Sequence, residues 1–154
     1  METYRTELTL EEVKALYVTM RELEETQCSK VVHLWDLEWT VRNLINMSRD
    51  HKIVKFYQGD KFCGILCFEY GTSWWTPEVT LSEVFVFAVK GFHGLQRYAI
   101  KELHKIAKEV KAAIITSGCF FQKNPQIVTN GYKKFGFNET YPTYAKVVKN
   151  NEQI

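Results

Sequence analysis

The 154-residue sequence lacks most features that mark secreted, metal-binding or membrane-spanning proteins. Its four cysteines form no CxxC pair, and no two histidines stand at zinc-ligand spacing, so we expect neither a disulfide framework nor a metal site. No apolar run approaches the roughly 18 residues of a membrane span. No basic segment followed by an apolar one, as in a signal peptide, is seen at the start. We therefore expect a cytoplasmic protein with reduced thiols and no membrane partner.

An excess of charge of one sign is also missing. Lysine and arginine total 20 against 18 aspartates and glutamates, a formal net charge of +2, which argues against nucleic acid as a partner. The content of hydrophobic residues, 45%, and of aromatic residues, 14%, excludes wholesale disorder and favours a rich core. The length fits a single domain over residues 1–154.

The most informative stretch covers residues 81–106. Its first nine residues are apolar at nearly every position, which is typical of a strand covered on both faces. Strict alternation would place on one face the side chains of Leu81, Phe85, Phe87 and Val89. From Leu95 onward apolar residues recur at helical spacing, after a loop that contains two glycines. A strand, a glycine loop and a helix in this order direct free backbone N–H groups at an anion.

Hydrophobic periodicity, caps and turn residues predict the remaining elements. The expected strands are residues 4–6, 52–57, 62–70, 81–89, 112–116 and 143–148. The first expected helix follows the capping box from Thr9 to Glu12 and ends near residue 27. The other expected helices are at 36–47, with Asp36 as its cap, at 95–110 and at 125–135. The helix expected between strands 81–89 and 112–116 makes a βαβ unit, whose right-handed crossover sets the two strands parallel. The result is a mixed α/β fold, an α+β mixed sheet in the order β-α-α-β-β-β-α-β-α-β.

Two local features call for an explanation beyond the fold. Gly131 lies within the last expected helix, where it costs about 1 kcal/mol relative to alanine. This position therefore predicts close packing or a ligand. Residues 71–77 are expected to form a turn, and the adjacent Trp74 and Trp75 lie within it. At least one of these indoles is expected to be exposed or to cover a partner, either in substrate binding or in contact with a protein.

Residues 132–137 read Tyr-Lys-Lys-Phe-Gly-Phe and resemble the Y-x-K-x-G-F signature that follows the fourth helix of GCN5-related N-acetyltransferases, the GNAT family. Residues 59–64, Gly-Asp-Lys-Phe-Cys-Gly, are similar to a turn and a third-strand glycine of the same family. Asn124 resembles the asparagine that opens the family's fourth helix, although it stands one residue farther from Tyr132. The resemblance spans nearly the whole chain, is strongest over residues 81–137, and implies the GNAT-like acyl-CoA N-acyltransferase fold.

The phosphate loop of the family, R/Q-x-x-G-x-G/A, falls on residues 91–96 of this chain. Only Gly94 matches, because Gly91 replaces the arginine or glutamine and Gln96 replaces the last small residue. Compensating positive charge would come from Lys90, Arg97 and Lys101. Divergent loops of this kind also occur in bacteriophage-encoded members, which the short, aromatic-rich chain resembles.

The resemblance implies direct transfer of an acetyl group from acetyl-CoA, as co-substrate, to a primary amine of a small molecule or a protein lysine. The amine needs a base, and the leaving thiolate needs an acid. For the base we choose Glu83, the only ionisable residue within the apolar strand, which would share a face with Phe85; the alternative is a strand-end glutamate facing water. For the acid we choose Tyr132, which matches the family's catalytic tyrosine; the alternative is a core tyrosine of an amphipathic helix.

The expected cofactor contacts follow from the same resemblance. A backbone N–H of Phe87 or Val89 would stabilise the developing oxyanion. Asn124 would hydrogen-bond the pantetheine arm, or would act only as a helix cap. His93 would approach a phosphate, or would be solvated. The complete set expected to bind the cofactor is Phe87, Val89, Lys90, Gly91, His93, Gly94, Gln96, Arg97 and Asn124.

Two other functions remain open at this point. The departure in the phosphate loop favours a GNAT-fold protein without catalysis, used as an interaction or virion-associated module. The lysines along the third helix would suit a nucleic-acid-binding accessory protein, although a solvated helix face explains them and the low net charge argues against this function. They are Lys101, Lys105, Lys108 and Lys111.

Overall fold

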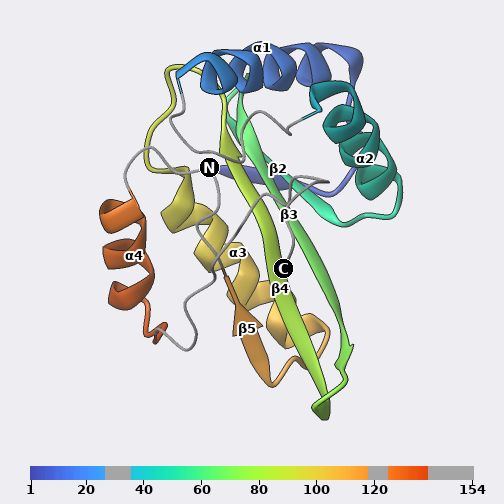
Figure 1. Cartoon of the computed structure of the whole chain (residues 1–154), viewed down its shortest axis with the longest axis vertical. Coiled ribbons are helices and arrows are strands. Elements are labelled where there is room, and N and C mark those ends of the chain that lie inside the picture. Colours follow the sequence, from blue (N-terminus) through green and yellow to red (C-terminus); the bar gives the residue numbers. More distant parts are fainter. Residues whose placement is uncertain (27–35, 118–124, 139–154) are drawn as a thin grey trace, which may run out of the picture.

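The computed structural model describes residues 1–26, 36–117 and 125–138, in which helices pack on both faces of one sheet (Figure 1). Its elements, in chain order, are β1 (Glu2–Tyr4), α1 (Leu10–Thr26), α2 (Leu37–Arg49), β2 (Ile53–Gln58), β3 (Lys61–Ser73), β4 (Thr76–Ala88), α3 (Leu95–Glu109), β5 (Ile114–Thr116) and α4 (Pro125–Lys134). The five strands stand in the order β1-β2-β3-β4-β5, antiparallel except for the parallel pair β4 and β5.

This mixed sheet confirms the predicted fold class and the parallel pairing across the third helix. The helix caps are confirmed too. The backbone N–H of Thr9 donates to Glu12 over 2.6 Å, the N–H of Glu12 donates to the Thr9 hydroxyl, and the Asp36 carboxylate caps α2. The strand predicted at residues 143–148 and the predicted cap Asn124 lie outside the described residues.

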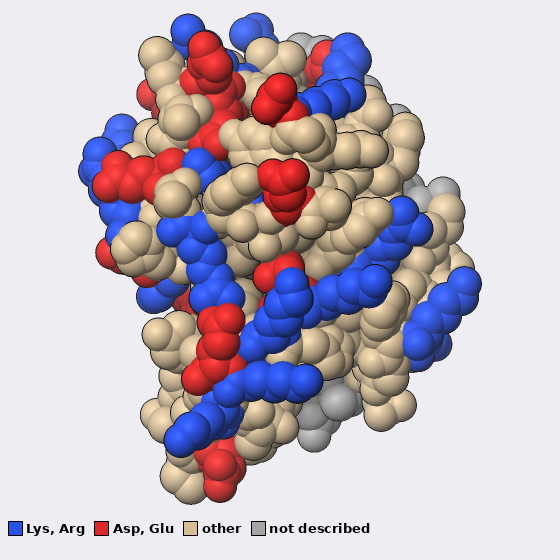
Figure 2. Space-filling model, turned by 180° about the vertical axis from the view of Figure 1, so that it is seen from behind, with Lys and Arg blue, Asp and Glu red and all other residues tan. Residues whose placement is uncertain are grey.

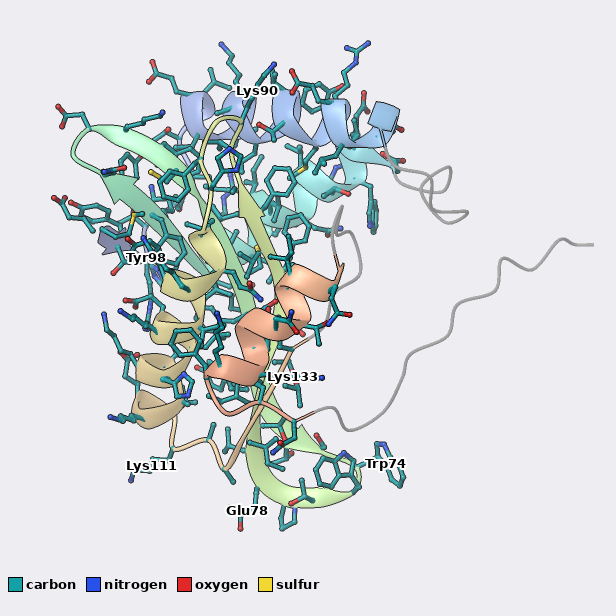
Figure 3. All side chains as sticks on the ribbon, turned by 90° about the vertical axis from the view of Figure 1, so that its left-hand side faces the viewer. Trp74, Glu78, Lys90, Tyr98, Lys111 and Lys133 are labelled. Carbon is teal, nitrogen blue, oxygen red and sulfur yellow. The ribbon has the colours of Figure 1, made fainter. Side chains whose placement is uncertain are left out.

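Three predicted boundaries are wrong. The strand expected at residues 112–116 begins only at Ile114. The first strand occupies Glu2–Tyr4 rather than residues 4–6, since the residues that pair with β2 run from Glu2, opposite Tyr57, to Tyr4, opposite Lys55. The turn predicted at residues 71–77 is much tighter, since β3 continues to Ser73 and β4 already begins at Thr76. The two strands therefore form a long ribbon with Trp74 and Trp75 at its end (Figure 3). Trp74 is 97% exposed there, as expected of at least one of the pair.

The core consists of two apolar layers, one on each face of the sheet. Between the sheet and α3 lie, among others, Phe56, Leu66, Phe68, Leu81, Leu95, Leu103 and Ile106. Between the sheet and α1 and α2 lie Leu16, Met20, Leu44, Ile53, Ile65, Phe87 and Val89. Helices α1 and α2 cover only the upper part of the sheet in Figure 1, whereas α3 extends farther along it.

The alternation predicted along the central strand is wrong at one point. Leu81 packs in the layer under α3, whereas Phe85 and Phe87 pack in the layer under α1 and α2. The cause is a shift of register: Glu83 lies opposite Phe68, and Phe85 lies opposite the adjacent residue of β3. Val84 is therefore the extra residue of a β-bulge, which reverses the faces after it. As a result Glu83 does not share a face with Phe85.

Three of the four lysines singled out above, Lys101, Lys105 and Lys108, lie on the exposed side of α3. Lys111 does not, because the helix ends at Glu109 and Lys111 lies in the following turn with a φ of 54°. Lys and Arg side chains gather across the face seen from behind (Figure 2). Acidic side chains are interleaved with them. Lys105 forms an ion pair with Glu102, and Arg5 forms a two-point ion pair with Glu109. This neutralisation agrees with a solvated helix face better than with a surface for a polyanion.

A buried polar network fixes the start of α1 against β2. The Glu12 carboxylate accepts a hydrogen bond from the Tyr57 hydroxyl and forms an ion pair with Lys55 at 2.9 Å, with side-chain exposures of 5% and 4% for Lys55 and Glu12. Lys55 also donates to the carbonyl of Glu7. Burial alone would raise the pKa of Glu12, but the hydrogen bonds from Tyr57 and Thr9 and the pairing with Lys55 hold that pKa below its usual value.

We expect Lys55→Met to lower the free energy of unfolding by about 3 kcal/mol, because it leaves the Glu12 carboxylate buried without its cation. The control is Lys52→Met, which removes an exposed pair with Glu69 at 4.0 Å and should cost about 0.5 kcal/mol or less. Urea unfolding at pH 7 measures both. Equal losses for the two variants would show that the buried pair has no special role.

Candidate active site

Two residues that are 49 positions apart in the sequence meet beside β4. The hydroxyl of Tyr132, on α4, donates to the carboxylate of Glu83, on β4, and lies 2.6 Å from each of its oxygens. Tyr132 is only 8% exposed. The residues chosen from the sequence as base and acid are thus brought into direct contact, an arrangement that neither choice required.

The environment of Glu83 favours a carboxyl group that holds a proton more tightly than usual. Burial raises the pKa of Glu83, while the hydroxyls of Tyr132 and Ser117 act in the opposite direction by favouring the charged form. Ser117 directly follows β5, and its buried hydroxyl oxygen lies near this carboxylate without a partner in hydrogen-bond geometry in the described part of the chain. A carboxylate with a raised pKa is a stronger base, which is what proton abstraction from an amine needs.

Ser117 does not stand out in the sequence, where it only follows the strand expected at residues 112–116. Its place follows from the pairing of β4 with β5, which ends where Ser82 meets Thr116. The residue after Thr116 is therefore the first to face the bulge at Glu83. A serine at a strand end is too common to single out, and the only sequence signal for this contact would be the register itself.

The end of α4 explains the local pattern of residues 132–137. Gly136 has a left-handed φ of 84°, its N–H donates to the carbonyl of Lys133, and the N–H of Phe137 donates to the carbonyl of Tyr132. This pair of hydrogen bonds is the Schellman arrangement, for which glycine is preferred. It turns the chain back so that the Phe137 ring packs edge-on against the Tyr132 ring, with centroids 5.2 Å apart. The glycine and the second aromatic residue thus orient the tyrosine.

The loop between β4 and α3 presents open backbone at a helix N-terminus. Gly91 and Gly94 have φ values of 81° and 77°, and a Cβ at either position would meet nothing within 4 Å. Gly94 is the N-cap of α3, no side chain caps the helix, and no acidic residue lies in its first turn. Backbone N–H groups in such a setting are suited to an anion such as a pyrophosphate.

Two of the cationic side chains expected around this loop, those of Lys90 and Arg97, have partners elsewhere. The ammonium of Lys90 pairs with Glu22 of α1 at 2.7 Å, and its backbone N–H donates to Thr19. The guanidinium of Arg97 lies over the ring of Tyr98, 4.7 Å from its centroid, and donates to its hydroxyl. His93 is exposed. Positive charge therefore flanks the loop rather than converging on it.

Gln96 turns its side chain toward α4. Its amide nitrogen donates to the carbonyl of Val128 over 2.8 Å, and its amide oxygen would lie 2.5 Å from a Cβ placed on Gly131. The glycine within α4 is thus explained by close packing, one of the two options that the sequence offered.

The backbone N–H groups of Phe87 and Val89, expected to stabilise an oxyanion, point toward the neighbouring strand of the sheet instead. The N–H of Val89 donates to the carbonyl of Cys63, within the sheet. Because N–H groups alternate in direction along an antiparallel strand, that of Phe87 also points toward β3. The N–H groups of Val86 and Ala88 point toward the opposite edge, and β5 pairs with β4 only as far as Ser82 in the described residues.

No protein-family model matches the sequence, and no curated protein matches it either. Solved structures do match in shape. A GNAT-family acetyltransferase from Listeria monocytogenes has 16% identity and a TM-score of 0.65 over 92% of this chain and 88% of its own. A possible acetyltransferase from Clostridium difficile has 15% identity and a TM-score of 0.67 over 96% and 97%. This chain has the fold of the GNAT acetyltransferases.

A third structure of this GNAT fold, a ribosomal-protein-alanine N-acetyltransferase from Brucella melitensis, has 9% identity and a TM-score of 0.64 over 96% of this chain and all of its own. Identities this low establish the fold and leave the activity to be argued from the residues. Within residues 1–26, 36–117 and 125–138, no helix is long and apolar enough to cross a membrane. The same ranges hold no group of three or more His, Cys, Asp or Glu side chains that could bind a metal ion.

Proposed function

We propose that this GNAT-fold protein is an N-acetyltransferase that moves an acetyl group from acetyl-CoA to a primary amine. The observation that carries the proposal is the contact between Tyr132 and the Glu83 carboxylate, at the point where the pairing of β4 with β5 ends. Transfer from a thioester requires an acid and a base in one place, next to backbone donors such as those of β4 that β5 leaves unpaired in the described residues. The acceptor is the amine of a small molecule or of a protein lysine.

The chain offers two features that fit acetyl-CoA. The pyrophosphate would be held by the loop of Gly91 and Gly94 and by the first turn of α3, since both present N–H groups without acidic neighbours on the helix. The thioester would lie along the edge of β4, where Val86 and Ala88 direct their N–H groups. In this assignment one of these two groups replaces Phe87 or Val89 as donor to the oxyanion.

The proton transfers follow from the pair. An ammonium acceptor first loses one proton to solvent, and the neutral nitrogen attacks the carbonyl carbon of the thioester. As the N–C bond forms, the excess proton on nitrogen passes to ionised Glu83. The C–S bond then breaks, and Tyr132 gives its proton to the leaving sulfur. The direct contact lets protonated Glu83 return a proton to Tyr132, which restores both groups for the next cycle.

Isothermal titration calorimetry with acetyl-CoA tests the first step of the proposal. We expect saturable binding with a Kd below about 1 mM, within the usual range for enzyme substrates. Gly94→Ala should weaken binding at least about tenfold, because the methyl group would stand in the open space at the N-cap of α3, next to the N–H groups proposed to hold the pyrophosphate. The matched control is Gly59→Ala in the β2–β3 turn, another left-handed glycine (φ 58°) with no neighbour within 4 Å, which should leave the Kd within about twofold.

A GNAT-fold interaction module without catalysis is the second candidate, favoured by the replacement of two of the three defining positions in the phosphate loop, at Gly91 and Gln96. The same titration separates the candidates. Absence of heat and of a thermal shift at millimolar acetyl-CoA would reject the enzyme and leave the interaction module.

A further inference from the structure

We infer that Gln96 is a positioning residue, which holds α4 and Tyr132 in register with the cofactor loop. The inference rests on the proposed function for its effect on turnover, but its structural part stands on the contacts of Gln96 alone. Gln96 is the second residue of α3, two positions after the N-cap Gly94. Gln96 is therefore close in the chain to the loop while its side chain contacts α4.

The partner that Gln96 selects on α4 links it to Tyr132. Its amide nitrogen donates to the carbonyl of Val128. In an α-helix that carbonyl also accepts the backbone N–H four residues later, which is the N–H of Tyr132. The glutamine and the backbone of the proposed acid thus share one acceptor.

Gly131 makes this contact possible. A Cβ at residue 131 would lie 2.5, 3.0 and 3.2 Å from the oxygen, the carbon and the nitrogen of the Gln96 amide. A side chain at this position would therefore displace the amide from Val128. Glycine within a helix costs about 1 kcal/mol relative to alanine. In α4 this destabilising residue allows a specific contact between two helices next to Tyr132.

The contact also gives a physical reason for the departure in the phosphate loop. A small residue at position 96 would leave the space beside Gly131 empty, whereas glutamine fills it and reaches α4. Gln96 and Gly131 therefore act as a matched pair: a long amide on α3 and a missing side chain on α4. The role assigned to Gln96 is to aim Tyr132 at Glu83, rather than to bind the cofactor through its side chain.

The test compares Gln96→Ala, Gly131→Ala and the double variant, all in the full chain. We expect each single variant to lower kcat about tenfold while the Kd for acetyl-CoA changes less than twofold. The double variant should be no slower than either single one, because both changes break the same contact. Gly131→Ala is the sharper case, since alanine improves helix propensity and should still lower kcat. The control is Gln126→Ala, which removes an exposed hydrogen bond to Asn130 within α4 and should leave kcat unchanged.

A second readout needs neither cofactor nor activity. Hydrogen exchange of the Tyr132 amide should accelerate about tenfold in Gln96→Ala and remain unchanged in Gln126→Ala. Only Gln96→Ala removes the hydrogen bond that fixes the Val128 carbonyl, which is also the acceptor of the Tyr132 amide. Unchanged exchange in Gln96→Ala would overturn the inference. A second result would also overturn it: Gln96→Ala weakens acetyl-CoA binding by the same factor as it lowers kcat/KM and leaves kcat unchanged. Gln96 would then be a direct cofactor ligand. If wild type binds no acetyl-CoA while exchange responds as expected, the proposed function fails and the positioning contact stands.

Discussion

Glu83→Gln is expected to lower kcat/KM for acetyl transfer at least about a hundredfold without loss of stability, because loss of a general base typically costs 10²–10⁴ in rate. Glutamine keeps the shape of the side chain and cannot accept the proton. The rate is measured as acetylated product formed from acetyl-CoA with a panel of a polyamine, an arylalkylamine and a lysine-containing peptide. The control is Glu78→Gln, at an exposed position on the same strand near the end of the ribbon (Figure 3), which should leave the rate unchanged.

The stability part of this prediction has a definite sign. Burial raises the pKa of Glu83 in the folded protein, so folding favours the protonated carboxyl. That contribution is present below the pKa of the unfolded chain and is lost as the pH rises through the higher folded pKa. The Tm of Glu83→Gln relative to wild type should therefore be more favourable at pH 8 than at pH 4. A carboxylate that merely stabilises the fold would give the opposite trend.

Tyr132→Phe is expected to lower kcat about a hundredfold, because the leaving thiolate loses its proton donor, with the Kd for acetyl-CoA changed less than twofold. It also shifts the pH profile. The Tyr132 hydroxyl favours the charged form of Glu83, so its removal raises the pKa of Glu83 further. The acidic limb of the kcat/KM profile, where Glu83 must be ionised, should move to higher pH.

The matched control for this variant is Tyr98→Phe, which removes another tyrosine hydroxyl in a hydrogen bond, the one that Arg97 donates to. It should leave kcat and the position of the acidic limb unchanged. An unaltered kcat in Tyr132→Phe would remove this residue from the role of acid and leave it as a packing residue against Phe137.

The fold and the two central residues were accessible from the sequence because their signals are local. The helix caps at Thr9 and Asp36 depend on residues three positions apart, and the structure shows both. Glu83 stood out as the one ionisable residue of an apolar strand, and Tyr132 through a six-residue pattern that also encodes its helix end. Their roles in acetyl transfer remain a prediction.

The parts that were not accessible depend on how distant segments meet. The bulge at Val84 is set by the register between β3 and β4, so simple alternation wrongly predicts that Glu83 shares a face with Phe85. The direction of the Val89 N–H follows from the same pairing. Gln96 and Gly131 were each noticed as unusual, but nothing in the chain order shows that they touch. Asn124 and residues 143–148 lie outside the described residues, and the roles expected of them stay predictions.

The most direct test of the central claim, that Glu83 and Tyr132 act together in acetyl transfer, is product formation from isotopically labelled acetyl-CoA over the same amine panel. Wild type is compared with Glu83→Gln, Tyr132→Phe and the double variant at pH 8. We predict labelled amide from at least one amine with wild type, and a double variant no slower than Glu83→Gln alone, because the two groups form one proton-transfer unit. Product formation by the double variant at the wild-type rate would contradict the account. So would a wild-type protein that binds acetyl-CoA but forms no product with any amine of the panel.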